Sequence, residues 1–146
     1  MEADLAREWA VDLNRALRDG VTMRIRQPGL VIGNPGAPKV NGAGQTGTTL
    51  QADGFSAGYA VRKGQFFALI ASGQRYLHQA AVGASASAGG VLAISIEPRL
   101  RLSPADNADI EFANVSIDGL LEDVPDHGYD PDQLARGFSI KIVEAR

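Results

Sequence analysis

Cysteine is absent from this chain of 146 residues, and no apolar run approaches the roughly 20 residues that a membrane-spanning helix needs. Without cysteine the protein has no disulfides, no thiolate metal sites and no cysteine nucleophile. The first 17 residues are acidic and amphipathic, which is the wrong chemistry for a signal peptide. We therefore expect a protein that is made in the cytoplasm, does not insert into membranes, and stays there or leaves as part of an assembly.

Charges of the two signs are separated along the chain. Residues 20–102 contain eight Lys or Arg and two acids, whereas residues 103–133 contain nine acids and no Lys or Arg. The simpler interpretation of this separation is that residues 103–133 form a solvated acidic loop. The alternative is that the chain is a subunit whose acidic face meets a basic face on a neighbouring copy. The basic residues are scattered and are not interleaved with aromatics, so nucleic acid is not an expected partner.

The first predicted element is an amphipathic helix over residues 2–18, followed by Gly20 in a C-cap position. Charged residues occupy its outer face. A strand follows over residues 21–26, where Arg24 and Arg26 share the outward face. The apolar stripe of the helix consists of Leu5, Trp9, Leu13, Ala16 and Leu17.

Short apolar runs bounded by Gly, Ser, Pro and Asn predict consecutive antiparallel strands in the middle of the chain. In residues 91–96 the bulky Leu92, Ile94 and Ile96 alternate with smaller side chains, so we expect these three in the core. The main runs are residues 65–70, 76–82, 91–96 and 110–117, with shorter ones at 50–53 and 59–61.

Strands dominate and the helix stands alone, which predicts one mainly β domain over residues 1–146. The expected architecture is an antiparallel β-barrel or β-sandwich with the amphipathic helix packed on it. Residues 83–90 are expected to be a flexible hairpin tip. The predicted segments are a helix and strand (1–26), a Gly/Pro-rich linker (27–49), the barrel core (50–118), an acidic loop (119–137) and a closing strand (138–146).

None of the patterns that carry catalysis or ligand binding is complete. Residues 42–49 have the glycine spacing of a phosphate loop, but Thr48 replaces the required lysine, so a flexible loop is predicted. His78 is expected on the solvent face of a strand, and no zinc or triad motif connects it with His127. The aspartates between residues 106 and 132 lack EF-hand spacing. We therefore predict no catalytic residue, no cofactor and no metal.

Several segments resemble tail proteins of long-tailed phages and their prophages, of the distal-tail or baseplate-hub kind. The similar stretches are GAGQTGTTLQADGFSAGYAVRKGQFFAL, GQRYLHQ, AISIEPRLRLSPADNADIEFANV and FSIKIVEA. Within the third, residues 98–108 (PRLRLSPADNA) resemble a turn that recurs between strands in such proteins. The helix REWAVDLNRAL is similar to the one that precedes this module, so the resemblance extends from about Arg7 to Ala145.

The resemblance implies a non-enzymatic structural subunit at the tail tip, which links the tail tube and the hub and is typically a hexameric ring. Its partners would then be other copies of itself and other phage tail proteins, with assembly in the cytoplasm and a final place in the virion tail. The residues expected to serve packing or interfaces are Trp9, Leu13, Leu17, Arg24, Arg26, Arg99, Arg101, Asp106 and Asp109.

Two other functions stay open. A β-sandwich module could bind carbohydrate on a host surface, with Tyr59 and Tyr76 as the stacking residues to test, although the chain has one Trp and three Tyr in all. A small hydrolase would require Asp109, Glu111 and His127 to meet in one pocket.

Overall fold

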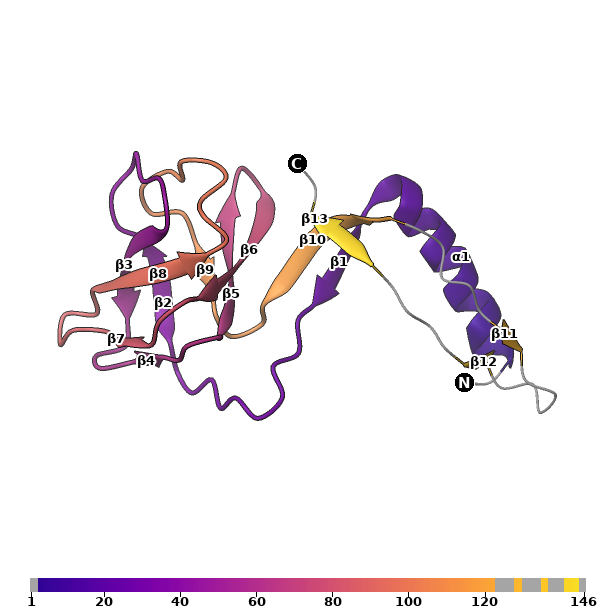
Figure 1. Ribbon diagram of the computed structural model, residues 1–146, viewed down its shortest axis with the longest axis horizontal. Helices are drawn as coiled ribbons and strands as arrows, with labels where there is room; N and C mark the ends of the chain where they lie inside the picture. Colours follow the sequence, from indigo (N-terminus) through magenta and orange to yellow (C-terminus); the bar gives the residue numbers. More distant parts are fainter. Residues whose placement is uncertain (1–2, 123–127, 130–134, 137–140, 145–146) are drawn as a thin grey trace. The chain divides into compact units, whose positions relative to one another are not determined.

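The computed structural model describes residues 3–122, 128–129, 135–136 and 141–144, with side chains for residues 8, 10–122 and 141–144. The chain forms two compact units. The barrel unit comprises residues 24–117, and the helix unit comprises residues 1–23 and 118–146. The prediction of a mainly β, antiparallel fold with one N-terminal helix is confirmed (Figure 1).

The barrel unit is a six-stranded sheet that closes almost completely on itself, in the spatial order β2-β3-β8-β6-β5-β9. Every neighbouring pair is antiparallel. The two end strands also meet, because an antiparallel bridge joins Lys39 to Asp109. The strands are β2 (Gly36–Val40), β3 (Thr49–Phe55), β5 (Phe66–Ala71), β6 (Gln74–Ala80), β8 (Leu92–Glu97) and β9 (Ile110–Glu111).

The hairpin between β5 and β6 follows directly from its turn residues. Ser72 and Gly73 have φ angles of 52° and 78°, and the strands pair from Ala71 with Gln74 onward. Positive φ at both central residues is the requirement of a type I′ turn, whose twist matches that of the two strands. The short ribbon of β4 (Ala60–Val61) and β7 (Ala84–Ser85) adds a second antiparallel pair to this unit.

The bulky side chains that alternate along β8 lie in the barrel interior, as predicted. Leu92, Ile94 and Ile96 are at most 5% exposed, whereas Val91 is 44% exposed. Aromatic side chains occupy the rest of the core: the ring of Phe112 stacks on Phe67 at a centroid distance of 4.9 Å. The interior is thus packed with side chains, as is usual in small barrels.

Two predicted loops are parts of the barrel instead. The linker of residues 27–49 contains β2, whose Val40 is fully buried; prolines within and beside this edge strand concealed it in the sequence. Residues 83–90 are not a flexible tip, because β7 pairs with β4 and Gly90 O accepts a hydrogen bond from Phe55 N at 3.2 Å.

The predicted strand at residues 110–117 is divided between two sheets. β9 ends at Glu111 in the barrel, and β10 (Ser116–Leu121) is the middle strand of the three-stranded sheet β1-β10-β13. The outer strands of that sheet are β1 (Val21–Arg24) and β13 (Ile142–Glu144). The intervening Phe112 and Val115 are buried in the barrel unit, so the apolar run continues through the break.

The helix unit contains α1 (Ala3–Asp19), and its small core confirms part of the predicted stripe. Leu13, Ala16 and Leu121 are buried, with Leu17 packed against them. Gly20 has a φ angle of 84°, as expected of a C-cap glycine.

β11 (Gly128–Tyr129) pairs with β12 (Ala135–Arg136). Of the predicted closing strand, residues 138–140 lie outside the described residues. No described helix has the length and apolar character to cross a bilayer.

Candidate functional site

The seam that closes the barrel joins two segments that are far apart in the sequence. Val40 N donates to Ala108 O at 2.9 Å, and Asn107 N donates to Val40 O at 2.9 Å. Gly42 N donates to Asp106 Oδ1 at 2.8 Å. Residues 40–42 and 106–108 are therefore held together by main-chain bonds and by one carboxylate, and both segments adjoin or belong to the stretches that carry the phage-tail resemblance.

The glycine-rich loop of residues 42–49 is ordered by the amide of Gln45. Gln45 Nε2 donates to Asn41 O at 2.9 Å and to Gln51 O at 3.1 Å, while Gln45 Oε1 accepts from Gln51 N at 2.7 Å. Leu100 N also donates to Gly47 O at 2.8 Å. The prediction of a flexible loop is thus wrong, because a neutral amide bridges the two sides of the loop.

We expect Asp106→Ala to weaken the seam locally. Removal of the acceptor leaves Gly42 N without its partner, at a cost of about 1 kcal/mol in the free energy of unfolding. The Gly42 amide should exchange with solvent faster, which hydrogen-exchange NMR measures. Asp106→Asn is the matched control, since it keeps an oxygen acceptor and should preserve slow exchange. Unchanged Gly42 exchange in Asp106→Ala would contradict this assignment.

The carboxylates of Asp109 and Glu111 are engaged in ion pairs. Lys39 Nζ lies 2.5 Å from Asp109 Oδ1, and Arg75 Nε lies 3.5 Å from Glu111 Oε2. A surface cavity of about 320 Å³ lies beside them, lined by residues 35–38, 70 and 109–113. Pro38, one of its lining residues, has no N–H to donate to the seam. The third residue of the hydrolase hypothesis, His127, lies outside the described residues.

His78 lies in the interior, so the prediction of a solvent-facing histidine is wrong. Its side chain is 2% exposed, and its ring stacks on Phe67 at 5.9 Å. Nδ1 lies 2.9 Å from Pro98 O, which requires an N–H at that nitrogen. Burial lowers the pKa of the imidazole, the bond to Pro98 partly opposes this, and the charge of Arg101 lowers the pKa further.

This burial predicts that the protein loses stability in mild acid. The unfolded chain binds a proton at His78 near the ordinary pKa of about 6.5, whereas the folded chain resists it, so the free energy of unfolding falls as the pH decreases from about 7.5 to 5.5. Urea titrations across that range measure the slope. His78→Gln should flatten it. An equal slope in His78→Gln and in the unchanged chain would show that His78 is not its source.

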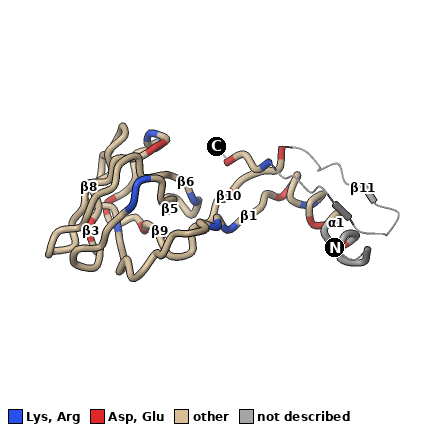
Figure 2. Tube along the Cα trace, turned by 60° about the horizontal axis from the view of Figure 1, so that its bottom comes forward, with Lys and Arg blue, Asp and Glu red and all other residues tan. Residues whose placement is uncertain are grey.

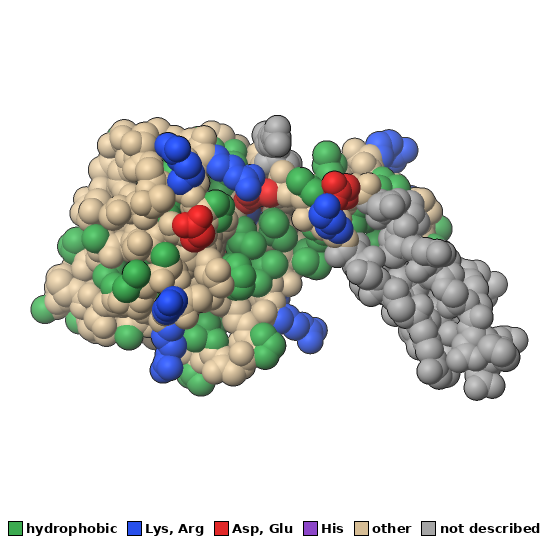
Figure 3. Space-filling model, viewed as in Figure 1, with side chains coloured by type: hydrophobic (Ala, Val, Ile, Leu, Met, Phe, Trp, Pro, Cys, Tyr) green, Lys and Arg blue, Asp and Glu red, His purple; other side chains and the backbone are tan. Residues whose placement is uncertain are grey.

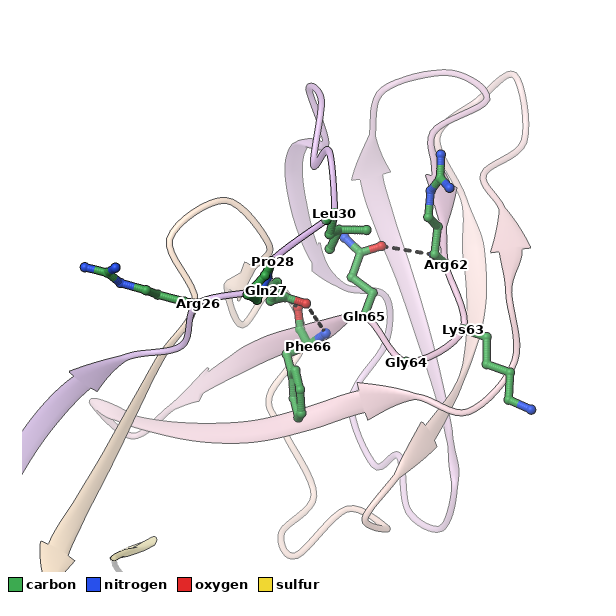
Figure 4. Close-up of a pocket in the computed structure, with 10 residues that line it drawn as sticks. Arg26, Gln27, Pro28, Leu30, Arg62, Lys63, Gly64, Gln65 and Phe66 are labelled. Atoms are coloured by element: carbon green, nitrogen blue, oxygen red, sulfur yellow. Dashed lines mark hydrogen bonds between the residues drawn. The ribbon is translucent and has the colours of Figure 1, made fainter. Parts of the chain in front are cut away.

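A second cavity of about 320 Å³ lies between residues 26–30 and 62–66 (Figure 4). Gln27 fixes one wall: its Oε1 accepts from Phe66 N at 2.7 Å and its Nε2 donates to Phe66 O at 3.2 Å. Gln65 fixes the other, because its Oε1 accepts from Arg62 N at 3.0 Å and its Nε2 donates to Tyr59 Oη at 3.1 Å. The side-chain amides of Gln27 and Gln65 therefore hold the two segments that line this cavity in place. Gln27 and its partner Phe66 are 39 residues apart in the sequence.

Cations surround this cavity without converging on it. Figure 4 shows the side chains of Arg26, Arg62 and Lys63 extending in three different directions. Most of the barrel trace carries no charge (Figure 2), and on the visible face the basic side chains stand apart from one another (Figure 3). Such spacing is unlike the basic stripe of a nucleic-acid interface. A small anion would not contact all three cations at once.

The helix unit has an apolar groove of about 260 Å³, lined mainly by Leu13, Ala16, Met23, Leu121 and Ile142. A second apolar feature is found on the sheet. Leu120 and Val143 are direct cross-strand neighbours, and they are 46% and 44% exposed. Small numbers of exposed apolar side chains are normal at protein surfaces, so this pair by itself indicates no partner.

The residues predicted for packing or interfaces divide into three groups. Leu13 and Leu17 pack within the helix unit, and the side chain of Trp9 lies outside the described residues. Asp106 and Asp109 hold the seam. The exposed remainder consists of Arg24, Arg26, Arg99 and Arg101.

Tyr59 and Tyr76, the residues named for carbohydrate stacking, are both packed against the barrel core. The Tyr59 ring stacks on Phe55 at 5.8 Å with an interplanar angle of 13°, and its hydroxyl is bound by Gln65. Among the described side chains, each aromatic ring is buried or partly buried. The rings of Tyr59 and Tyr76 are thus used in the core.

Sequence reasoning missed the three glutamines that order this unit: Gln27, Gln45 and Gln65. They belong to no motif, and their partners are main-chain groups or a tyrosine hydroxyl. The described residues contain no cluster of three or more His, Asp or Glu that could hold a metal ion. The chain matches no protein-family model and no curated protein. The geometry and the sequence resemblance therefore carry the functional argument.

Proposed function

We propose that this chain is a structural, non-enzymatic subunit of a phage or prophage tail tip, which links the tail tube and the hub and ends in the virion tail. The observation that supports this most is the barrel seam. Two segments that belong to the similar stretches, residues 42–49 and 98–108, meet there and bond to each other and to β2. The similar residues thus form one structural feature.

The use of polar side chains supports the same function. Gln45, Gln65 and Asp106 bond to the main chain of their own barrel, and Asp109 forms an ion pair with Lys39 across the seam. These groups stabilise a rigid barrel whose outer surface is available to neighbours. A rigid module with contact surfaces is what a tail subunit requires.

The test is deletion of the gene from the phage or prophage that carries it, with a tagged copy supplied in trans. We expect induced particles without the copy to lack complete tails in negative-stain electron microscopy. The tagged protein should sediment with particles in a density gradient when complementation restores the tails. Complete tails without the gene, with the tagged protein remaining at the top of the gradient, would contradict the proposal.

A further inference from the structure

The strongest unassigned surface is the cavity between residues 26–30 and 62–66, because its charge is of one sign. Its ten lining residues include Arg26, Arg62 and Lys63, and none is a carboxylate. All three cations are exposed, and none forms an ion pair with a carboxylate that the structure describes. The cavity thus offers positive charge without a counter-charge of its own.

The arrangement of this cavity selects an extended ligand over a compact one. The three cations extend in different directions (Figure 4), so a ligand must lie across the cavity to reach more than one of them. Between them the lining contains Pro28, Leu30 and Phe66. A fitting ligand is therefore a polypeptide segment in which carboxylates alternate with apolar side chains.

Residues 123–132 of this same chain, which come after β10, have that composition. The sequence DVPDHGYDPD contains four acids and no Lys or Arg, and Val, Pro and Tyr lie between the acids. We propose that the cavity is the docking site for residues 123–132 of a second copy of the chain. The inference rests on the proposed function, since a tail subunit needs a contact with its own copies.

Such a contact joins two different surfaces of identical subunits. Contacts of this head-to-tail kind produce rings when the rotation between neighbours closes, and filaments when it does not. The attraction is between exposed charges, so it weakens as salt screens it. Association of the purified chain should therefore decrease as salt rises from about 0.05 M to about 0.5 M.

Sedimentation velocity of the full-length chain tests the contact with charge reversals. We expect Arg62→Glu with Lys63→Glu to weaken self-association at low salt about tenfold, a change of about 1.4 kcal/mol. Asp123→Lys with Asp126→Lys should weaken it similarly. An equimolar mixture of the two variants should associate again, because each altered surface then finds its complement. Arg15→Glu with Arg99→Glu is the matched control: it changes the net charge equally at exposed positions that do not line the cavity.

Three results would overturn the inference: a monomer at every salt and protein concentration, association that the cavity reversals leave unchanged, or a mixture that does not associate. A chain that sediments with phage particles but is monomeric in solution would remove this contact and leave the proposed function standing. Conversely, charge-dependent association of a chain that never enters particles would support the contact and remove the proposed function.

Discussion

Phe112→Ala is expected to lower the free energy of unfolding by about 3–5 kcal/mol, a large part of the total for a domain of this size. Phe112 is 1% exposed and stacks on Phe67 at 4.9 Å. It also meets Phe55 edge-on at 5.4 Å and Tyr59 at 6.1 Å. Truncation therefore removes a buried ring and leaves a cavity at the centre of the aromatic cluster.

Urea denaturation followed by fluorescence or circular dichroism measures this loss. Phe66→Ala is the matched control, because it removes the same atoms from a partly buried position at the cavity of Figure 4. We expect the control to cost clearly less than Phe112→Ala. Equal losses for the two variants would contradict the view that the aromatic cluster is the centre of the barrel core.

Gly90→Ala is expected to destabilise the barrel by several kcal/mol, for two reasons that act together. Its φ angle of 75° is unfavourable for any residue with a Cβ, at about 1–2 kcal/mol. The added Cβ would also collide with the main-chain oxygen of Phe55, which cannot move aside as a side chain could. The close approach exists because Phe55 N donates a hydrogen bond to Gly90 O.

Gly58→Ala separates the two contributions. Gly58 has a φ angle of 70°, but no heavy atom lies within 4 Å of the position that the added methyl group would occupy. The substitution should therefore cost only the backbone contribution of about 1–2 kcal/mol. Thermal and urea unfolding of both variants give the difference. A Gly90→Ala protein as stable as Gly58→Ala would show that β3 and the residue 90 turn can separate without loss.

Local patterns were enough to predict several elements correctly. The alternation in residues 91–96 placed Leu92, Ile94 and Ile96 inside, since a strand exposes its two faces in turn. Ser72-Gly73 marked the β5–β6 turn. The period of α1 placed Leu13 and Ala16 on the buried face. Each of these features depends on residues close together in the sequence.

Other features could not be predicted because they depend on contacts between distant residues. The residues next to His78 in the sequence do not show whether its side chain faces solvent or the core. The packing of its ring on Phe67 and its contact with Pro98 O place it in the core. β2 is interrupted by Pro38 and is a strand because β3 pairs with it. The cavity at residues 26–30 exists because Gln27 bonds to Phe66.

By itself the sequence determined that the chain is mainly β with one helix, where several strands lie, and that its charges are separated. These properties come from periodicity, turn chemistry and composition, which are local or additive. Only the tertiary structure decided that residues 40–42 close the barrel against residues 106–108, and that three cations surround one cavity. Barrel closure and cavity shape arise when the strands fold together, so no single stretch of sequence contains them.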